Sequence, residues 1–149
     1  MTASFDIRPL RAADRASWGA LWRGYLEFYG ADVADDHDDL LFSRLIDGER
    51  DDLQGWVAEQ DGKLVGFAHI VVHSHSWRAE QVTYLQDLFA APQSRGTGLG
   101  RALIETVYAD ADAKGRGTVY WLTQTTNTTA RTLYDRIAQP TDFMKYSRN

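Results

Sequence analysis

The chain has 149 residues, so we expect one domain, residues 1–149, around a single hydrophobic core. Its formal net charge of -5 argues against a nucleic-acid partner, because phosphate backbones favour clustered Lys and Arg. The absence of cysteine excludes thiol nucleophiles and thiolate metal sites, and the absence of long apolar runs predicts a soluble cytoplasmic protein without membrane association.

The first half of the chain predicts a strand, two helices and a hairpin. Apolar residues recur at three- and four-residue intervals after Asp14, a candidate cap, and stop before Gly30, which indicates a helix. The dipeptide Asp61-Gly62 is typical of a tight hairpin turn. In chain order we expect a strand over 4–9, a helix over 15–29, a solvated acidic loop over 32–39, a helix over 40–46, and strands over 56–59 and 63–72.

The second half predicts alternating strands and helices. Residues 82–90 are apolar on both faces except at Gln86 and Asp87, as in a central strand. The remaining elements are a helix with Leu99, Leu103, Ile104, Val107 and Ala111 on its buried side, closed by Gly115, a strand over 118–124, a helix over 127–138 and a closing strand over 142–147. The predicted fold class is α/β (α+β): a mixed, mostly antiparallel sheet flanked by helices, in the order β-α-α-β-β-β-α-β-α-β.

A glycine-rich turn joins the strand over 82–90 to the helix that follows. Gly96, Gly98 and Gly100 allow close backbone approach, and the free N–H groups at a helix start attract an anion such as phosphate or pyrophosphate. A nucleotide triphosphatase loop would need Lys and then Ser or Thr after its last glycine, where this chain has Arg101-Ala102. The glycine spacing also departs from a dinucleotide fingerprint. The turn therefore predicts a phosphate site of another kind.

This turn resembles the signature of the GNAT family of N-acetyltransferases, which is Gln or Arg, two residues, Gly, one residue, then Gly or Ala. Both 93–98 and 95–100 satisfy it. The preceding strand resembles the family's fourth strand, and Asn127 and Tyr134 fall where a second family motif would place them. The resemblance extends over nearly the whole chain and is greatest to the histone/polyamine and spermidine/spermine acetyltransferase branch.

The resemblance implies acetyl-CoA as co-substrate and assigns residues to it. Leu88, Phe89 and Ala90 would line the pantetheine arm, a backbone N–H near Leu88 would polarise the acetyl carbonyl, and Asn127 would contact CoA. Tyr134 would be the general acid that protonates the departing thiolate, although a core tyrosine is the alternative. The backbone N–H groups that would hold the pyrophosphate belong to Arg95, Gly96, Thr97, Gly98, Leu99, Gly100 and Arg101.

The residues leave the general base open. Related polyamine acetyltransferases have a glutamate where this chain has Gln86, and an amide cannot take a proton. Asp87 is the nearest carboxylate, but strand alternation directs it to the opposite face unless a bulge intervenes. We assign no base.

Metal ligation and acceptor recognition have weaker signals. His73 and His75 lack a third ligand, so we expect no metal, and His69 could lie in the core or in a pocket. The acidic residues of 32–39 could attract a cationic amine, although a solvated face is the commoner role for such a run. Four aromatic residues could do the same through cation-π contacts, although an aromatic stripe is more often core: Trp18, Trp22, Tyr25 and Tyr29.

We therefore expect an enzyme, an acetyl-CoA-dependent N-acetyltransferase that transfers the acetyl group directly to a primary amine, with a polyamine or another small cationic amine as acceptor. The alternatives are acetylation of a protein lysine or N-terminus, and a non-catalytic acetyl-CoA-binding module. By analogy with the family we also expect a homodimer, with the closing strand over 142–147 completed by or exchanged with that of the partner.

Overall fold

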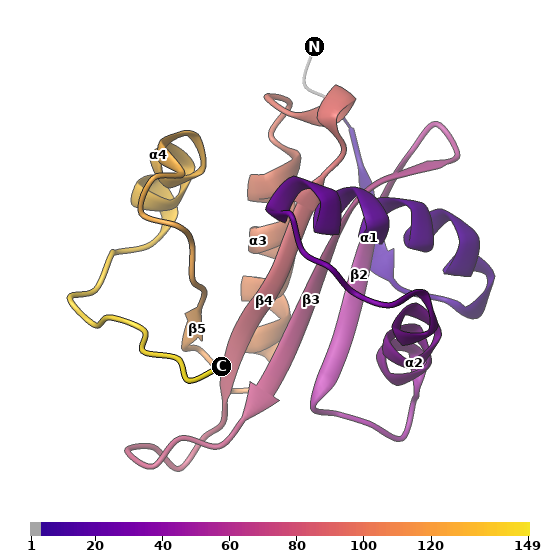
Figure 1. The fold of residues 1–149 in the computed structure, drawn as a ribbon. Helices are drawn as coiled ribbons and strands as arrows, with labels where there is room; N and C mark the ends of the chain where they lie inside the picture. Colours follow the sequence, from indigo (N-terminus) through magenta and orange to yellow (C-terminus); the bar gives the residue numbers. More distant parts are fainter. Residues whose placement is uncertain (1–3) are drawn as a thin grey trace.

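Five strands form one sheet in which neighbouring strands follow chain order (Figure 1). The computed structural model describes residues 4–149. The first four strands pair antiparallel and the fifth lies parallel to the fourth, so the predicted mixed, mostly antiparallel sheet is confirmed. The strands are β1 (Asp6–Pro9), β2 (Leu53–Gln60), β3 (Lys63–His73), β4 (Val82–Ala90) and β5 (Val119–Tyr120).

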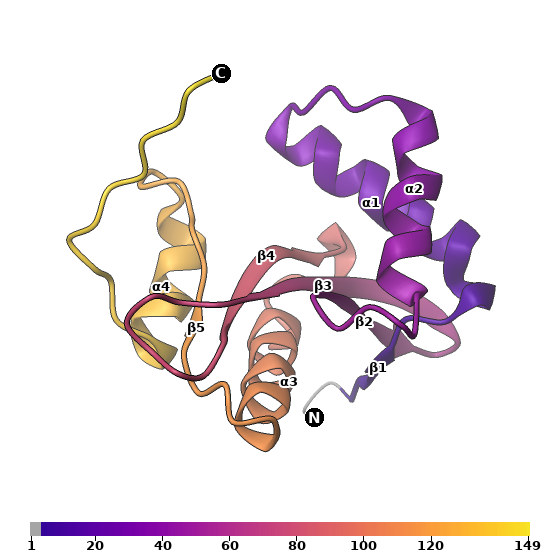
Figure 2. The same ribbon diagram turned by 90° about the horizontal axis from the view of Figure 1, so that it is seen from below.

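Four α-helices flank the sheet (Figure 2). Two of them, α1 (Arg15–Tyr29) and α2 (Asp35–Ile46), cover one face, and α3 (Leu99–Ala113) covers the other. The last helix, α4 (Thr128–Ile137), lies at the β5 edge of the sheet. Among the helices of residues 4–149, none is both long and apolar enough to cross a membrane.

A hydrophobic cluster on each face holds the helices to the sheet. Trp18 and Trp22 of α1, 0% and 6% exposed, pack with Phe67 and Phe89 of the sheet. Burying a large apolar side chain contributes about 1.5–3 kcal/mol, so these contacts fix α1 firmly. On the other face, α3 buries the five residues predicted from its periodicity, whereas α4 buries no residue fully.

The local turn signals are also confirmed. Asp61 and Gly62 between β2 and β3 have φ values of 52° and 77°, the left-handed conformation that a two-residue hairpin requires. Gly30 ends α1 in the same conformation. Asp14 precedes α1 as predicted, but its side chain does not cap that helix. Its carboxylate accepts hydrogen bonds from the side chain of Arg8 and from the backbone N–H of Arg11, 2.8 Å away.

The solvated acidic loop predicted over 32–39 is shorter in the structure, and one of its five aspartates is buried. α2 already begins at Asp35, because aspartates in a first helical turn interact favourably with the helix dipole. Asp38 is only 5% exposed, and its carboxylate accepts hydrogen bonds from Trp22 Nε1 at 3.1 Å and from Arg23 Nε at 2.7 Å. The Arg23 guanidinium thus compensates the buried charge, and Asp38 serves the packing of α2 on α1.

The chain beyond α3 departs further from the prediction. The strand expected over 118–124 is shortened to β5, which pairs with β4 only at Thr83 and Tyr84. The strand expected over 142–147 is wrong, because this segment has no strand beside it to complete a hydrogen-bonded ladder. Its large apolar side chains are at least 77% exposed: Phe143, Met144 and Tyr146.

Candidate active site

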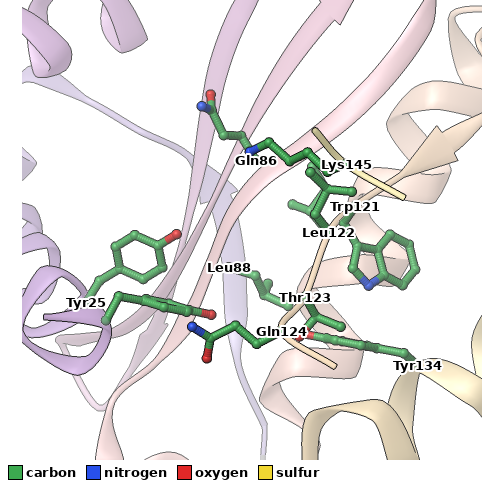
Figure 3. Close-up of a pocket in the computed structure, with 11 residues that line it drawn as sticks. Tyr25, Gln86, Leu88, Trp121, Leu122, Thr123, Gln124, Tyr134 and Lys145 are labelled. Atoms are coloured by element: carbon green, nitrogen blue, oxygen red, sulfur yellow. The ribbon is translucent and has the colours of Figure 1, made fainter. Parts of the chain in front are cut away.

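A cavity of about 270 Å³ lies where the chain after β5 separates from β4 (Figure 3). Helix α1 provides one wall, β4 a second, and the segment after β5 together with α4 and the C-terminal segment provides the rest. In Figure 3, Gln86 and Lys145 are drawn at one end of the cavity and Gln124 and Tyr134 at the other. Its lining residues are Tyr25, Tyr29, Leu85, Gln86, Leu88, Trp121, Leu122, Thr123, Gln124, Tyr134 and Lys145.

The edge of β4 that faces this cavity has free backbone groups. The N–H of Ala91 donates to Val65 O at 2.8 Å, so Ala91 directs its hydrogen-bonding groups at β3. Because these groups alternate along an antiparallel strand, the backbone N–H and C=O of Phe89 also point toward β3, and those of Leu88 and Ala90 point away from it. Beyond Tyr84 no strand of the described chain pairs with that side of β4. The Leu88 N–H is therefore free to donate to a ligand.

Tyr134 on α4 lines the cavity and packs edge-on against Trp121, with ring centroids 5.3 Å apart. Burial is the main reason why the pKa of Tyr134 is raised above that of a free tyrosine. The hydroxyl therefore keeps its proton at neutral pH and can donate it. Tyr134 is both partly buried and exposed to the cavity, so its packing and chemical roles are compatible.

The glycine-rich turn lies between β4 and α3. Gly96 and Gly98 have φ values of 77° and 88°, and a Cβ added at either would meet no atom within 4 Å. Backbone conformation is thus the reason for glycine at both positions. The N–H groups of Gly96, Thr97 and Gly98 have no backbone acceptor among residues 4–149, and those of the first turn of α3 have none within the helix. The Arg95 N–H, which was expected to join them, instead donates to Pro92 O at 3.4 Å. Such a cluster of free donors fits an anion.

Three polar residues expected near CoA differ in the contacts that their side chains make. Asn127 precedes α4, but its side chain makes no capping hydrogen bond and contacts Thr123 Oγ1 only at 3.5 Å. The guanidinium of Arg95 lies over the rings of Phe28 and Phe89, 5.1 and 5.6 Å from their centroids. Arg101 is paired with the carboxylate of Glu105. The Asn127 amide is therefore freer to bind a ligand than either arginine side chain.

A β-bulge decides where the carboxylate of Asp87 lies. His69 pairs with Asp87 and Ile70 pairs with Leu85, so Gln86 is an extra residue in β4. Gln86 and Asp87 consequently both lie on the α1 face of the sheet, where Asp87 accepts a hydrogen bond from Tyr25 Oη at 2.7 Å. Simple alternation would have directed Asp87 to the opposite face.

The other sequence candidates fall into two groups. Tyr25 and Tyr29 line the cavity, whereas Trp18 and Trp22 belong to the core. His73 bonds Tyr120 Oη at 2.7 Å, and residues 4–149 hold no group of three or more His, Cys, Asp or Glu side chains that could bind a metal.

Sequence reasoning missed Lys145 and the residues 122–124. Lys145 lies on the C-terminal segment, for which a strand was expected, and no local pattern distinguishes it from a surface lysine. Residues 122–124 were assigned to a strand, and their place in the cavity follows only from the separation of β4 and β5.

Comparison with known proteins identifies the family. Residues 18–138 match the model of the acetyltransferase (GNAT) family. The chain belongs to this family. It is similar to the D-amino-acid N-acetyltransferase HPA3 of Saccharomyces cerevisiae, with 36% identity over 147 residues that cover 96% of this chain and 89% of that protein. The uncharacterized N-acetyltransferase YhfO of Bacillus subtilis is 29% identical and covers 97% of both chains.

Solved GNAT structures confirm the fold. The structure of AAC(6')-Iy in complex with a bisubstrate analog containing CoA has a TM-score of 0.85, with 20% identity and 99% coverage of both chains. Family membership and the N-acetyltransferase relatives make this GNAT chain an acetyl-CoA-dependent N-acetyltransferase. The non-catalytic alternative is thereby set aside. The relatives differ in the acceptors that their names give, so the family defines the reaction rather than the acceptor.

Proposed function

We propose that the chain acetylates the primary amine of a small molecule that enters the cavity between β4 and residues 121–124. The observation that carries this proposal is the position of that cavity. It adjoins the open edge of β4 and is lined by Tyr134. A thioester bound along β4 would bring its acetyl group to the cavity, where an amine could attack it.

The cofactor side of the proposal uses backbone groups. The free N–H groups from Gly96 to Arg101 bind the pyrophosphate of acetyl-CoA, joined on one side by Arg95 and on the other by the amide of Asn127. The pantetheine arm lies along Leu88, Phe89 and Ala90. The outward Leu88 N–H donates to the acetyl oxygen and stabilises the negative charge that forms there during attack.

Tyr134 is the proposed general acid. Its hydroxyl is protonated at neutral pH because burial raises its pKa, and it lies on the α4 wall of the cavity. Donation of this proton to the CoA sulfur lets the C–S bond break without release of a free thiolate.

For the acceptor we propose a small amino acid. Lys145 lines the cavity and forms no ion pair with a carboxylate of the described chain, so its ammonium group can bind the carboxylate of a zwitterion. The 36% identical relative is named as a D-amino-acid N-acetyltransferase, which supports the same class.

A polyamine is the second candidate. Tyr25, Tyr29, Trp121 and Tyr134 give the cavity aromatic walls, and such rings attract cations. Lys145 argues against this candidate, because its ammonium group would repel the positive charges of a polyamine.

Two experiments test these proposals in turn. Calorimetric titration with acetyl-CoA should give saturable binding, and its absence at millimolar concentration would overturn the cofactor site. Initial rates should then be measured with D-amino acids, L-amino acids, spermidine and a lysine peptide, for the wild type and Lys145→Ala. We expect Lys145→Ala to lower kcat/KM for an amino acid about 10-fold or more, since a charge-assisted hydrogen bond contributes about 1.5–3 kcal/mol. An unchanged value, or activity on spermidine or the peptide alone, would contradict the amino-acid assignment.

A further inference from the structure

A chain of hydrogen bonds runs from the buried interior to the cavity wall. Trp18 Nε1 lies 3.0 Å from His69 Nε2, and His69 Nδ1 lies 3.0 Å from Asp87 Oδ2. The other carboxylate oxygen, Asp87 Oδ1, lies 2.7 Å from Tyr25 Oη. Trp18 and His69 are 0% and 1% exposed, whereas Tyr25 lines the cavity. The chain of hydrogen bonds thus connects a solvent-excluded interior to the proposed acceptor site.

The partners fix the direction of each hydrogen bond. An indole N–H only donates, so His69 Nε2 must accept from Trp18. The imidazole is therefore neutral with its proton on Nδ1, and that N–H donates to Asp87 Oδ2. The Tyr25 hydroxyl donates to Asp87 Oδ1. Asp87 accepts two hydrogen bonds, and Tyr25 Oη keeps a lone pair that can accept a proton from the cavity side.

The groups around Asp87 come from three elements. Tyr25 and Tyr29 belong to α1, His69 to β3 and Tyr84 to β4 itself. Burial is the main cause that raises the pKa of each of these tyrosines, and the Asp87 charge raises it further. The tyrosines are neutral at pH 7, and Lys145 is the cationic side chain that lines the same cavity as Tyr25 and Tyr29.

We propose that Tyr25 and Asp87 form the proton relay that deprotonates the acceptor amine, with His69 and Trp18 holding Asp87 in place. The relay takes the role that Gln86 cannot perform, and it depends on the bulge that brings Asp87 to the α1 face. Tyr25 is the catalytic residue of this relay, because it lines the cavity in which the amine would bind. Asp87 receives the proton through Tyr25, and His69 is a positioning residue.

The proton transfer balances in two linked steps. One N–H bond of the acceptor ammonium breaks as that proton bonds to Tyr25 Oη. The original O–H bond of Tyr25 breaks at the same time, and its proton bonds to Asp87 Oδ1. The products are a neutral amine, an unchanged tyrosine and a protonated Asp87, which later releases its proton to solvent. The amine lone pair is then free to attack the acetyl carbon.

The test is the pH dependence of kcat/KM between pH 6 and 10 with an amine that the wild type acetylates, D-alanine or spermidine. Tyr25→Phe keeps the ring and removes the hydroxyl, and Asp87→Asn keeps the shape and removes the proton acceptor. Each should lower kcat/KM at pH 7 about 100-fold or more. The loss should shrink toward pH 10, because the amine then becomes neutral without a base. The double variant should be no worse than either single variant within about 3-fold, since the residues act as a unit.

The matched control is Tyr108→Phe. It removes a hydroxyl that donates to Ile137 O at 2.9 Å, outside the cavity, and should leave kcat/KM unchanged. A loss in Tyr25→Phe that stays constant with pH, or no loss at all, would overturn the relay even if Asp87→Asn fails to fold. The relay rests on the proposed function only in taking the cavity as the acceptor site. A wild type that acetylates no amine overturns both, whereas an active wild type beside unaffected variants overturns the relay alone.

Discussion

The two ends of α3 offer a matched test of the proposed anion site. Gly98 precedes the helix with φ of 88° and Gly115 follows it with φ of 69°, and neither has an atom within 4 Å of an added Cβ. Valine at either position therefore adds backbone strain, and its Cβ meets no neighbouring atom. A β-branched residue avoids this left-handed conformation, and the cost is about 2 kcal/mol.

Gly98→Val and Gly115→Val should differ in ligand affinity and agree in stability. Each should lower the free energy of unfolding in urea by up to about 2 kcal/mol, or the melting temperature by about 4–8 °C for a chain of this size. Only Gly98→Val moves the N–H groups proposed to bind pyrophosphate. If the turn relaxes by the full 2 kcal/mol, the Kd for acetyl-CoA measured by calorimetry rises about 30-fold. Equal Kd values in the two variants would refute the assignment of the turn to the pyrophosphate.

Three further outcomes are expected. Tyr134→Phe should lower kcat about 100-fold or more while the Kd for acetyl-CoA is unchanged, and unchanged turnover would remove Tyr134 from the mechanism. Asp14→Ala should lower the free energy of unfolding in urea by about 1.5–3 kcal/mol, because it removes the hydrogen bonds that the part-buried Arg8 guanidinium donates to this carboxylate. Arg8 lowers the pKa of Asp14, so the wild type should keep this contribution above pH 4 and lose it as the pH falls through the lowered pKa, whereas Asp14→Ala should lose less stability in acid. Light scattering should give a homodimer for the full chain and a monomer after truncation at Pro140, since the segment beyond it exposes Phe143, Met144 and Tyr146; a full-length monomer would contradict the dimer.

The sequence was sufficient to predict the elements whose apolar side chains recur at a regular interval. The buried face of α3 could be predicted because the 3.6-residue repeat is unbroken from Leu99 to Ala111. The hairpin at Asp61-Gly62 and the glycine turn could be predicted because both need backbone conformations that few residues adopt. Family membership followed from that turn together with its context.

The sequence-based predictions are wrong or incomplete where contacts between distant residues override the local sequence pattern. Asp38 looks solvated in a run of acids, and only Arg23 and Trp22 on another helix make its burial possible. The position of Asp87 depends on one extra residue in β4, which no alternation rule reveals. Lys145 lines the cavity although it lies in an exposed segment without regular secondary structure, where no periodic pattern distinguishes it.

Helix α4 packs against the core through partly buried side chains, Leu133, Tyr134 and Ile137, so we expect acetyl-CoA binding to be linked to its local folding. This helix buries no residue fully, and the cavity separates the segment that precedes it from β4. An elongated thioester lying in that space would supply apolar contacts to both sides, contacts that the polypeptide itself does not make. We therefore expect the C-terminal quarter of the chain to open locally at a lower free energy than the α1 and α3 cores, and to be stabilised as the ligand concentration rises. Amide protons of α4 would exchange with solvent faster than those of α3 in the free enzyme and slow down as the co-substrate saturates it.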